Sequence, residues 1–251
     1  MLKLENVSKS FGGVAATRDV SLDFPAGSLT AVIGPNGAGK TTLFNLITGR
    51  FPADAGRILL DGEDIAALSP RAIVHRGIGR AFQIASLFPT LSVRDALASA
   101  VQAHRRQEMR LFARFPEAEI SARTDFLLEW LQLTHSANII SANLSHGDQK
   151  LLDIGLALAL EPKVLLLDEP TAGMGPDERW QMIETVQRLW REGGLTLVFI
   201  EHDMDIVFKV AQTIRVLSYG SVLAEGDAEA IRNNQAVIEA YLGKSAQKVP
   251  A

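Results

Sequence analysis

The chain has 251 residues, 47% of them hydrophobic, which suffices for one large α/β domain or a domain with a subdomain. It contains no cysteine, which excludes disulfides, thiolate catalysis and Cys-ligated metal. Twenty-five Lys and Arg against 29 Asp and Glu give a formal net charge of -4, so no overall basic field indicates nucleic-acid binding.

The N-terminus and the apolar runs argue against a membrane-spanning segment. The first ten residues mix charged and apolar side chains and do not have the apolar core of a secretory signal, so we expect the mature chain to start near Met1. The longest apolar stretches, 155–160 and 164–167, are far shorter than the ~18 residues that cross a bilayer. Any membrane association is therefore expected to be peripheral.

The first part of the chain is predicted to be rich in strands. Residues 2–7 and 20–24 alternate apolar and polar side chains, as half-buried strands do, whereas 28–33 is more continuously apolar, as a central strand is. A helical pattern follows over 43–47, and another strand is predicted at 57–62, where it ends in a turn.

The middle of the chain changes character. Strand patterns disappear over about 93–160, and apolar residues recur there at helical spacing, which predicts a helical insert. Alternating strands and helices are then predicted again, with strands at 164–169, 195–200 and 213–218 and helices at 177–191 and from Asp203 onward. The last eight residues have the composition of a frayed polar tail.

A phosphate-binding loop is the strongest motif. The stretch "GPNGAGKTT" fits G-x-x-x-x-G-K-[ST] and lies between a predicted strand and a predicted helix, a context that an incidental glycine-rich turn does not explain. Backbone N–H groups and the helix N-terminus would face phosphate oxygens, Lys40 would reach the β- and γ-phosphates, and Thr41 would offer its hydroxyl to Mg²⁺. The predicted nucleotide-binding residues are Gly34, Pro35, Asn36, Gly37, Ala38, Gly39, Lys40, Thr41 and Thr42.

Two carboxylates end the apolar strand "VLLLDEP". The carboxyl end of a central strand lies at the crevice where open α/β sheets bind ligands. We expect Asp168 to hold Mg²⁺ through water and Glu169 to polarise the attacking water. The alternative, a solvated strand end before a turn at Pro170, does not account for the phosphate loop elsewhere in the chain.

The ordered set of "GPNGAGKTT", Gln83, "LSHGD", "VLLLDE" and His202 resembles the nucleotide-binding subunit of an ABC transporter over nearly the entire chain. The resemblance implies an α/β P-loop NTPase fold, an ABC ATPase domain with an antiparallel β subdomain and a helical subdomain. It implies a single domain over 1–251, with the helical subdomain at about 93–160, including "LSHGD", and C-terminal helices and tail at about 227–251.

The same resemblance assigns roles to residues that the patterns alone leave open. It implies that Gln83 links the nucleotide and its Mg²⁺ to the membrane partner, that His202 is the switch histidine near the γ-phosphate, and that Phe11 stacks on adenine. Taken singly, Gln83 could be an ordinary polar loop residue and His202 a helix cap or surface histidine. Phe11 near a strand end could simply belong to the core.

The stretch "LSHGD" departs from the family's "LSGGQ", which closes over ATP bound to another subunit. Ser145 and Gly147 retain the groups that would face that γ-phosphate. His146 and Asp148 differ, yet Ser145 to Asp148 also has the form of a capping box, so Asp148 is expected to define the helix start. Gly175 stands where the family commonly has an Asp in the loop that couples the two ATP sites.

Several longer stretches narrow the resemblance, among them "FGGVAATRDVSL", "GIGRAFQIASLFPTLSV" and "EAIRNNQAVIEAYLG". They resemble the ATPase subunits of branched-chain amino acid importers, a group that includes urea and amide importers. The resemblance implies a peripheral ATPase on the cytoplasmic face of the inner or plasma membrane that uses ATP and Mg²⁺. Its implied partners are a second copy or a paralogous ATPase subunit, integral membrane permease subunits and, indirectly, a periplasmic or extracellular solute-binding protein, with no nucleic acid.

Two other functions are weighed against this one. A soluble ABC ATPase that acts on nucleic acid or ribosomes would favour tandem ATPase domains, a long coiled coil or a basic tail, none of which the sequence shows. A P-loop kinase for a small molecule would not account for "LSHGD" or for Glu169 directly after Asp168.

Overall fold

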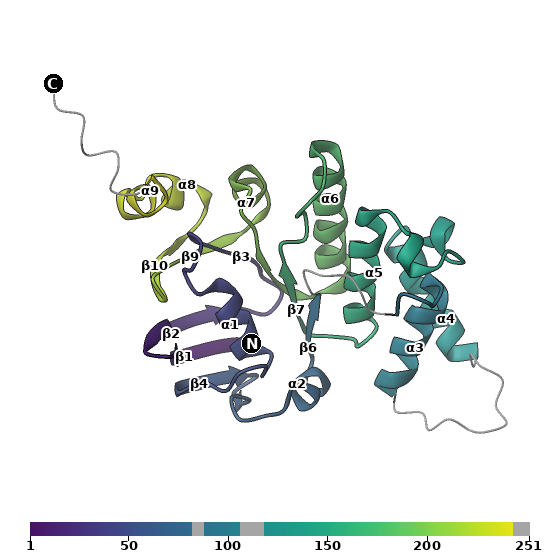
Figure 1. Ribbon diagram of the computed structural model, residues 1–251, viewed down its shortest axis with the longest axis horizontal. Helices are drawn as coiled ribbons and strands as arrows, with labels where there is room; N and C mark the ends of the chain where they lie inside the picture. Colours follow the sequence, from purple (N-terminus) through teal and green to yellow (C-terminus); the bar gives the residue numbers. More distant parts are fainter. Residues whose placement is uncertain (82–87, 106–117, 243–251) are drawn as a thin grey trace.

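The structure is a computed structural model that describes residues 1–81, 88–105 and 118–242, and in it two β-sheets enclose one helix (Figure 1). The first sheet is antiparallel, with the order β2-β1-β4-β5. Its strands are β1 (Leu2–Phe11), β2 (Val14–Phe24), β4 (Ala55–Leu60) and β5 (Glu63–Asp64). In β1 the buried residues are Leu2, Leu4 and Val7, and in 20–24 they are Val20, Leu22 and Phe24, which confirms the half-buried pattern that the sequence predicts there.

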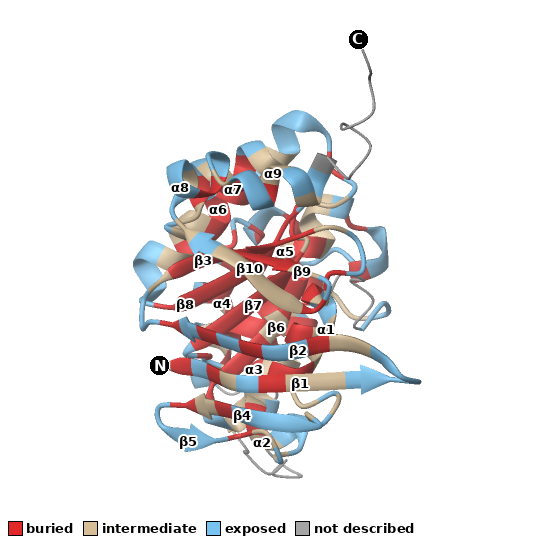
Figure 2. Cartoon of the chain, turned by 90° about the vertical axis from the view of Figure 1, so that its left-hand side faces the viewer, coloured by how far each residue is buried: buried red, intermediate tan, exposed pale blue. Residues whose placement is uncertain are grey.

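The second sheet has six strands in the order β10-β9-β3-β8-β7-β6. Five of its strands run parallel to one another, and β10 is antiparallel to β9. The strands are β3 (Leu29–Ile33), β6 (Ile78–Ala81), β7 (Val164–Asp168), β8 (Thr196–Ile200), β9 (Thr213–Ser218) and β10 (Ser221–Gly226). Every residue of β3, β7 and β8 is buried (Figure 2). Since these three strands are neighbours, their carboxyl ends meet at one edge of the sheet.

Helix α1 (Lys40–Ile47) lies between the two sheets. Its Leu43 and Phe44 belong to the same buried cluster as Leu4 of the antiparallel sheet and Val32 and Val198 of the parallel one. The opposite face of the parallel sheet packs against a second apolar cluster, to which helices α3 (Val93–Arg105), α4 (Ala118–Trp130), α5 (His146–Leu158), α6 (Pro176–Gly193) and α7 (Met204–Val210) contribute. The parallel sheet is therefore covered on both faces.

The described part of 93–160 forms helices and short turns with no β-strand, and α3, α4 and α5 gather on the side away from the antiparallel sheet (Figure 1). The turns are η1 (Thr134–Ser136) and η2 (Ser141–Asn143), and two short helices, α8 (Ala228–Arg232) and α9 (Gln235–Leu242), follow β10. The limits of the helical and C-terminal subdomains stay predictions. No helix in the described residues is long and apolar enough to cross a membrane.

Four short elements have no counterpart in the sequence prediction: α2 (Pro70–Arg76), β5, β6 and β10. β6 has only four residues, "IGRA", at the edge of the sheet, and one of them is an arginine, so neither a continuous apolar run nor a clean alternation marks it. α2 does carry start signals, since Ser69 caps it and Pro70 opens it, but its seven residues are too few for a clear period.

Candidate functional site

The phosphate loop connects β3 to α1, and two of its glycines are required by close packing. Gly34 has φ 150°, and a Cβ atom there would lie 2.1 Å from the carbonyl oxygen of Leu217. Gly39 has φ 102°, and its Cβ would lie 2.3 Å from the carbonyl oxygen of Ala16. Because both obstacles are backbone atoms, no larger residue fits without moving a strand.

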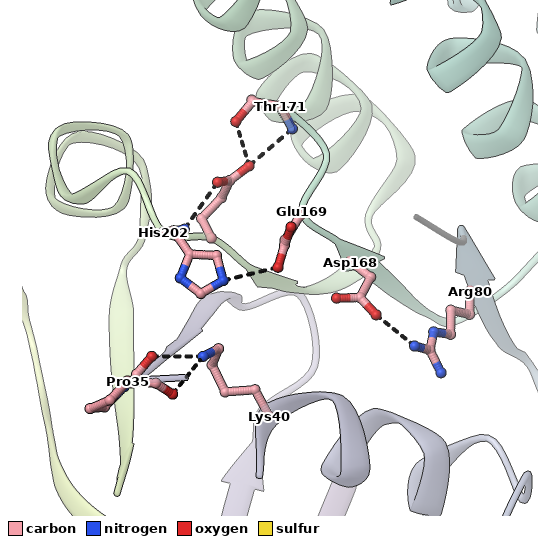
Figure 3. Close-up of polar contacts among 9 residues, drawn as sticks. Pro35, Lys40, Arg80, Asp168, Glu169, Thr171 and His202 are labelled. Carbon is pink, nitrogen blue, oxygen red and sulfur yellow. Dashed lines mark hydrogen bonds and ion pairs between the residues drawn. The ribbon is translucent and has the colours of Figure 1, made fainter. Parts of the chain in front are cut away.

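Lys40 points back into this loop (Figure 3). Its Nζ donates to the carbonyl oxygens of Gly34, at 2.6 Å, and Pro35, at 3.1 Å. Burial lowers the pKa of Lys40, while the nearby carboxylates of Glu169 and Asp168 act in the opposite direction. The ammonium group is thus held by neutral acceptors that anionic phosphate oxygens can replace with stronger hydrogen bonds.

A cavity of about 230 Å³ opens beside the loop. It brings together residues from four segments: Ala16, Asn36, Gly37, Ala38, Gly39, Lys40, Thr41, Thr42, Glu169 and His202. Most of the predicted nucleotide residues therefore share one hollow with the two predicted catalytic side chains that the structure describes. Thr41 and Asp168 offer the hard oxygen donors that suit Mg²⁺, which usually takes one or two protein oxygens and completes its shell with phosphate and water.

Glu169 and His202 form a pair at the ends of β7 and β8 (Figure 3). His202 Nε2 lies 2.9 Å from Glu169 Oε1. Glu169 has a left-handed backbone with φ 49°, which is uncommon for a residue other than glycine. Its N–H donates to the carbonyl of Ile200 at 3.0 Å. The hydrogen bond to the neighbouring strand fixes this turn.

Asp168 pairs with an arginine that the sequence analysis misses. Arg80 on β6 donates to Asp168 Oδ2 at 2.6 Å, and the two side chains are only 6% and 5% exposed. Arg80 also donates to Asn45 Oδ1 on α1 at 2.8 Å. The only sequence signal is a charged residue within the short apolar stretch before Gln83, and nothing local indicates its partner.

Glu201, directly before His202, is a second buried residue that the sequence analysis misses. Its carboxylate accepts from Thr171 N at 3.0 Å, from Thr171 Oγ1 at 2.6 Å and from His202 N at 3.2 Å. It therefore joins the loop after β7 to the loop after β8. A buried carboxylate needs such donors, because an unpaired charge in this place would be costly.

Ser145 caps α5, as the sequence predicts, but the predicted capping box is only half formed. Ser145 Oγ accepts from the N–H of Asp148 at 3.1 Å. The Asp148 carboxylate does not return to the N–H of the cap. It accepts from Ser136 Oγ at 3.1 Å and lies 3.5 Å from His135 Nε2. A tertiary neighbour has replaced the local partner.

Two further positions of this region make specific contacts. His146 Nε2 donates to the carbonyl oxygen of Ala172 at 3.0 Å. Gly175 is the N-cap of α6, and its N–H donates to Glu178 Oε2 at 3.1 Å. His146 and Gly175, which both depart from the family pattern, therefore each form a hydrogen bond within the chain.

Ser145 and Gly147 line a cavity of about 520 Å³, together with Asp148, Met174 and residues of α6. This cavity shares no residue with the one beside the phosphate loop. Within one chain, the structure therefore does not bring "LSHGD" and the phosphate loop into one pocket.

Phe11, the predicted adenine contact, stands apart from the phosphate-loop cavity. Phe11 does not line it, is 43% exposed and packs edge to face on Phe51, with ring centres 5.2 Å apart. Gln83 lies outside the described residues, as does most of the apolar stretch 84–89.

Two family models and a curated relative match the chain. Residues 17–172 match the family described as ABC transporter, and residues 221–247 match the family described as branched-chain amino acid ATP-binding cassette transporter. The chain is 36% identical to the high-affinity branched-chain amino acid transport ATP-binding protein LivG of Escherichia coli K12, over 98% of each chain.

Solved structures show the same fold. A nucleotide-binding relative, an ATP-binding cassette of an ABC transporter in its ADP conformation, superposes with a TM-score of 0.86 at 33% identity, covering 97% of this chain and 99% of that one. A second, described as a dimeric post-hydrolysis state bound to ADP and phosphate, gives a TM-score of 0.76 at 27% identity, over 91% and 99% of the two chains.

Proposed function

The chain belongs to the ABC transporter family as an ATP-hydrolysing subunit, and we propose that it energises the import of branched-chain amino acids. The observation that carries the choice of solute is the match of residues 221–247 to the branched-chain amino acid family, beside near full-length similarity to a transporter of those solutes. Urea and amides are the related solutes to test against it.

Nucleotide binding begins at the phosphate loop. Lys40 exchanges the carbonyls of Gly34 and Pro35 for the β- and γ-phosphates, and the N–H groups of the loop face the phosphate oxygens. Thr41, Asp168 and Gln83 are the residues that would hold Mg²⁺, which when bound neutralises charge on the phosphates. Phe11, exposed at the end of β1, is the candidate for stacking on adenine.

Hydrolysis is assigned to the pair at the strand ends. Glu169 accepts the proton of the attacking water, and His202 places its Nε2–H near the γ-phosphate. The existing hydrogen bond between them keeps both side chains on the same rim of the cavity. Asp168, whose charge is balanced by Arg80, is the carboxylate proposed to hold Mg²⁺ through water.

A second subunit completes each site. Since "LSHGD" and the phosphate loop occupy separate cavities, Ser145 and Gly147 are proposed to close over ATP bound to another subunit, either a second copy or a paralogue. The dimeric solved relative supports this arrangement. Donors from the partner at the γ-phosphate would then make turnover depend on pairing.

The remaining partners are proposed from kinship with transport proteins. They are integral membrane permease subunits, contacted through Gln83 and the stretch 84–89 at the cytoplasmic face of the membrane, and indirectly a solute-binding protein. Phe88, the described aromatic residue of that stretch, is 43% exposed and so is available for contact.

The test is transport by a reconstituted complex. The chain is co-expressed with its permease subunits, purified, and placed in vesicles with ATP and the solute-binding protein, and uptake of labelled leucine, urea and acetamide is measured. We expect ATP-dependent uptake of leucine that disappears with Glu169→Gln. Uptake of urea or acetamide without uptake of leucine would refute branched-chain amino acids as the solute. Sedimentation with ribosomes or nucleic acid, and none with membranes, would instead support a non-transport ABC ATPase.

A further inference from the structure

The loop of residues 171–175, between β7 and α6, is tied to the rest of the chain on two sides. One tie comes from the signature stretch on α5, and the other comes from the strand end that precedes His202. Both ties are hydrogen bonds to the first two residues of the loop. The loop therefore lies between the motif that serves a partner's ATP and the residues that serve the chain's own.

The first tie is His146 to Ala172. A carbonyl oxygen can only accept, so the 3.0 Å contact requires a proton on His146 Nε2. The imidazole also packs tightly against the next residue: Gly173 has φ 80°, and a Cβ atom there would lie 3.0 Å from His146 Nε2. A glycine at position 146, as in the family's "LSGGQ", could make neither contact.

The second tie continues to the catalytic pair without a gap. Thr171 donates twice to Glu201, at 3.0 and 2.6 Å, and Glu201 also accepts from the N–H of His202 at 3.2 Å. His202 Nε2 in turn lies 2.9 Å from Glu169 (Figure 3). Glu201 is buried, so it has little freedom to break these bonds independently.

We propose that His146 is a positioning residue that links closure of "LSHGD" over the partner's ATP to the placement of Glu169 in its own chain. The link runs from the backbone of Ala172 and Thr171 to the carboxylate of Glu201. From there it continues through His202 to Glu169. It supplies a connection between the two ATP sites in a chain whose loop has Gly175 instead of a carboxylate. The inference rests on the proposed pairing of two subunits.

Three single variants test the hydrogen bond. His146→Leu keeps bulk but loses the donor, and His146→Gln keeps a donor at similar reach. We expect His146→Leu to lower kcat roughly threefold to tenfold, the scale of one lost hydrogen bond, and to move the Hill coefficient for ATP toward 1, with KM unchanged. His146→Gln should restore both values. His75→Leu makes the same side-chain change on α2, at a histidine that lines neither of the two cavities, and as the matched control it should behave as wild type.

Mixed dimers of two differently tagged copies give the direction of the effect. In both arrangements one copy carries Glu169→Gln, so that only the other copy's Glu169 hydrolyses ATP. In the first, His146→Leu is in the hydrolysing copy; in the second, it is in the inactive copy, whose "LSHGD" covers the hydrolysed ATP. The proposed link predicts the loss in the first arrangement only.

Each other result overturns the inference. A loss in the second arrangement only would mean that His146 acts directly on the partner's nucleotide, and equal losses would mean a general structural effect. No loss in either, or a His146→Gln protein as slow as His146→Leu, would show that the hydrogen bond carries nothing. If the parent proteins do not pair with ATP, the proposed function fails as well, and that failure appears before any position 146 variant is measured.

Discussion

The phosphate-loop side of the site and the signature side are built in different ways. On the phosphate-loop side, Gly34 and Gly39 seat against backbone carbonyls, and the loop follows the expected motif at every position. On the signature side, side chains define the geometry: Ser145 caps α5, His146 holds Ala172, and Glu178 holds Gly175. A site shaped by backbone contacts tolerates little change, whereas one shaped by side chains can exchange residues if another contact replaces the lost one.

The largest expected difference between the two sides is in turnover. Glu169→Gln should lower kcat by about 10²–10⁴-fold, the range for removing a general base, while ATP binding persists. Lys40→Ala should instead lose ATP binding. Glu178→Gln makes the same chemical change on the signature side, where the side chain accepts from the N–H of Gly175 at the start of α6, and should leave kcat within about twofold of wild type. Phosphate release and ATP titration measure both, and wild-type turnover of Glu169→Gln would remove Glu169 from catalysis.

The carboxylate contacts of the two sides should differ next. Arg80→Met leaves Asp168 buried without its guanidinium partner and should lower the free energy of unfolding by about 3–5 kcal/mol. His135→Gln removes the more exposed and longer contact to Asp148 and should change the free energy of unfolding little. Urea denaturation gives both values. Equal losses would show that burial does not set this contrast.

Glycine substitutions compare the two backbones directly. Gly34→Ala forces a Cβ against the Leu217 carbonyl and should cost about 2–3 kcal/mol of stability. Gly147→Ala meets only Ser145 Oγ, at 4.0 Å, in a helical turn, and should be neutral or stabilise by up to about 1 kcal/mol. Thermal melts at matched buffer conditions decide. A Gly147→Ala protein as unstable as Gly34→Ala would contradict the distinction between the sides.

The smallest effect is expected at the cap of α5. Ser145→Ala should cost about 1 kcal/mol of stability, the usual loss of an N-cap. ATP affinity of the isolated subunit should not change, because Ser145 does not line the cavity beside its own phosphate loop. Asp148→Gln serves as the control, since it introduces the family's residue and should preserve ATP-driven pairing. A weaker nucleotide affinity for isolated Ser145→Ala would show that the two cavities communicate within one chain.

Sequence reasoning succeeds where one short segment contains all the information. The phosphate loop can be predicted because its motif consists of consecutive residues. Asp168 and Glu169 can be predicted because the carboxyl ends of central strands form the crevice. The continuous apolar runs of β3, β7 and β8 identify those central strands. The roles of these residues stay predictions.

The rest depends on which distant residues meet. The pairs Arg80–Asp168 and Thr171–Glu201 join segments that are 88 and 30 positions apart, and no local period indicates them. The capping box fails for the same reason: Ser136, twelve positions before Asp148, offers the carboxylate a hydroxyl that a local pattern does not include. Partner choice by buried polar groups is a tertiary property.

The position of α1 between the two sheets has a consequence for how the protein folds. Lys40 is the first residue of a helix whose apolar side chains pack against segments from both the early and the late parts of the chain. We therefore expect the phosphate loop to form only when these distant segments have assembled. Nucleotide then binds the native state alone and adds about 2.7 kcal/mol of stability when its concentration is a hundred times Kd. ATP thereby stabilises the whole domain. We expect both sheets to melt together in a single cooperative transition, whose midpoint temperature rises with nucleotide concentration.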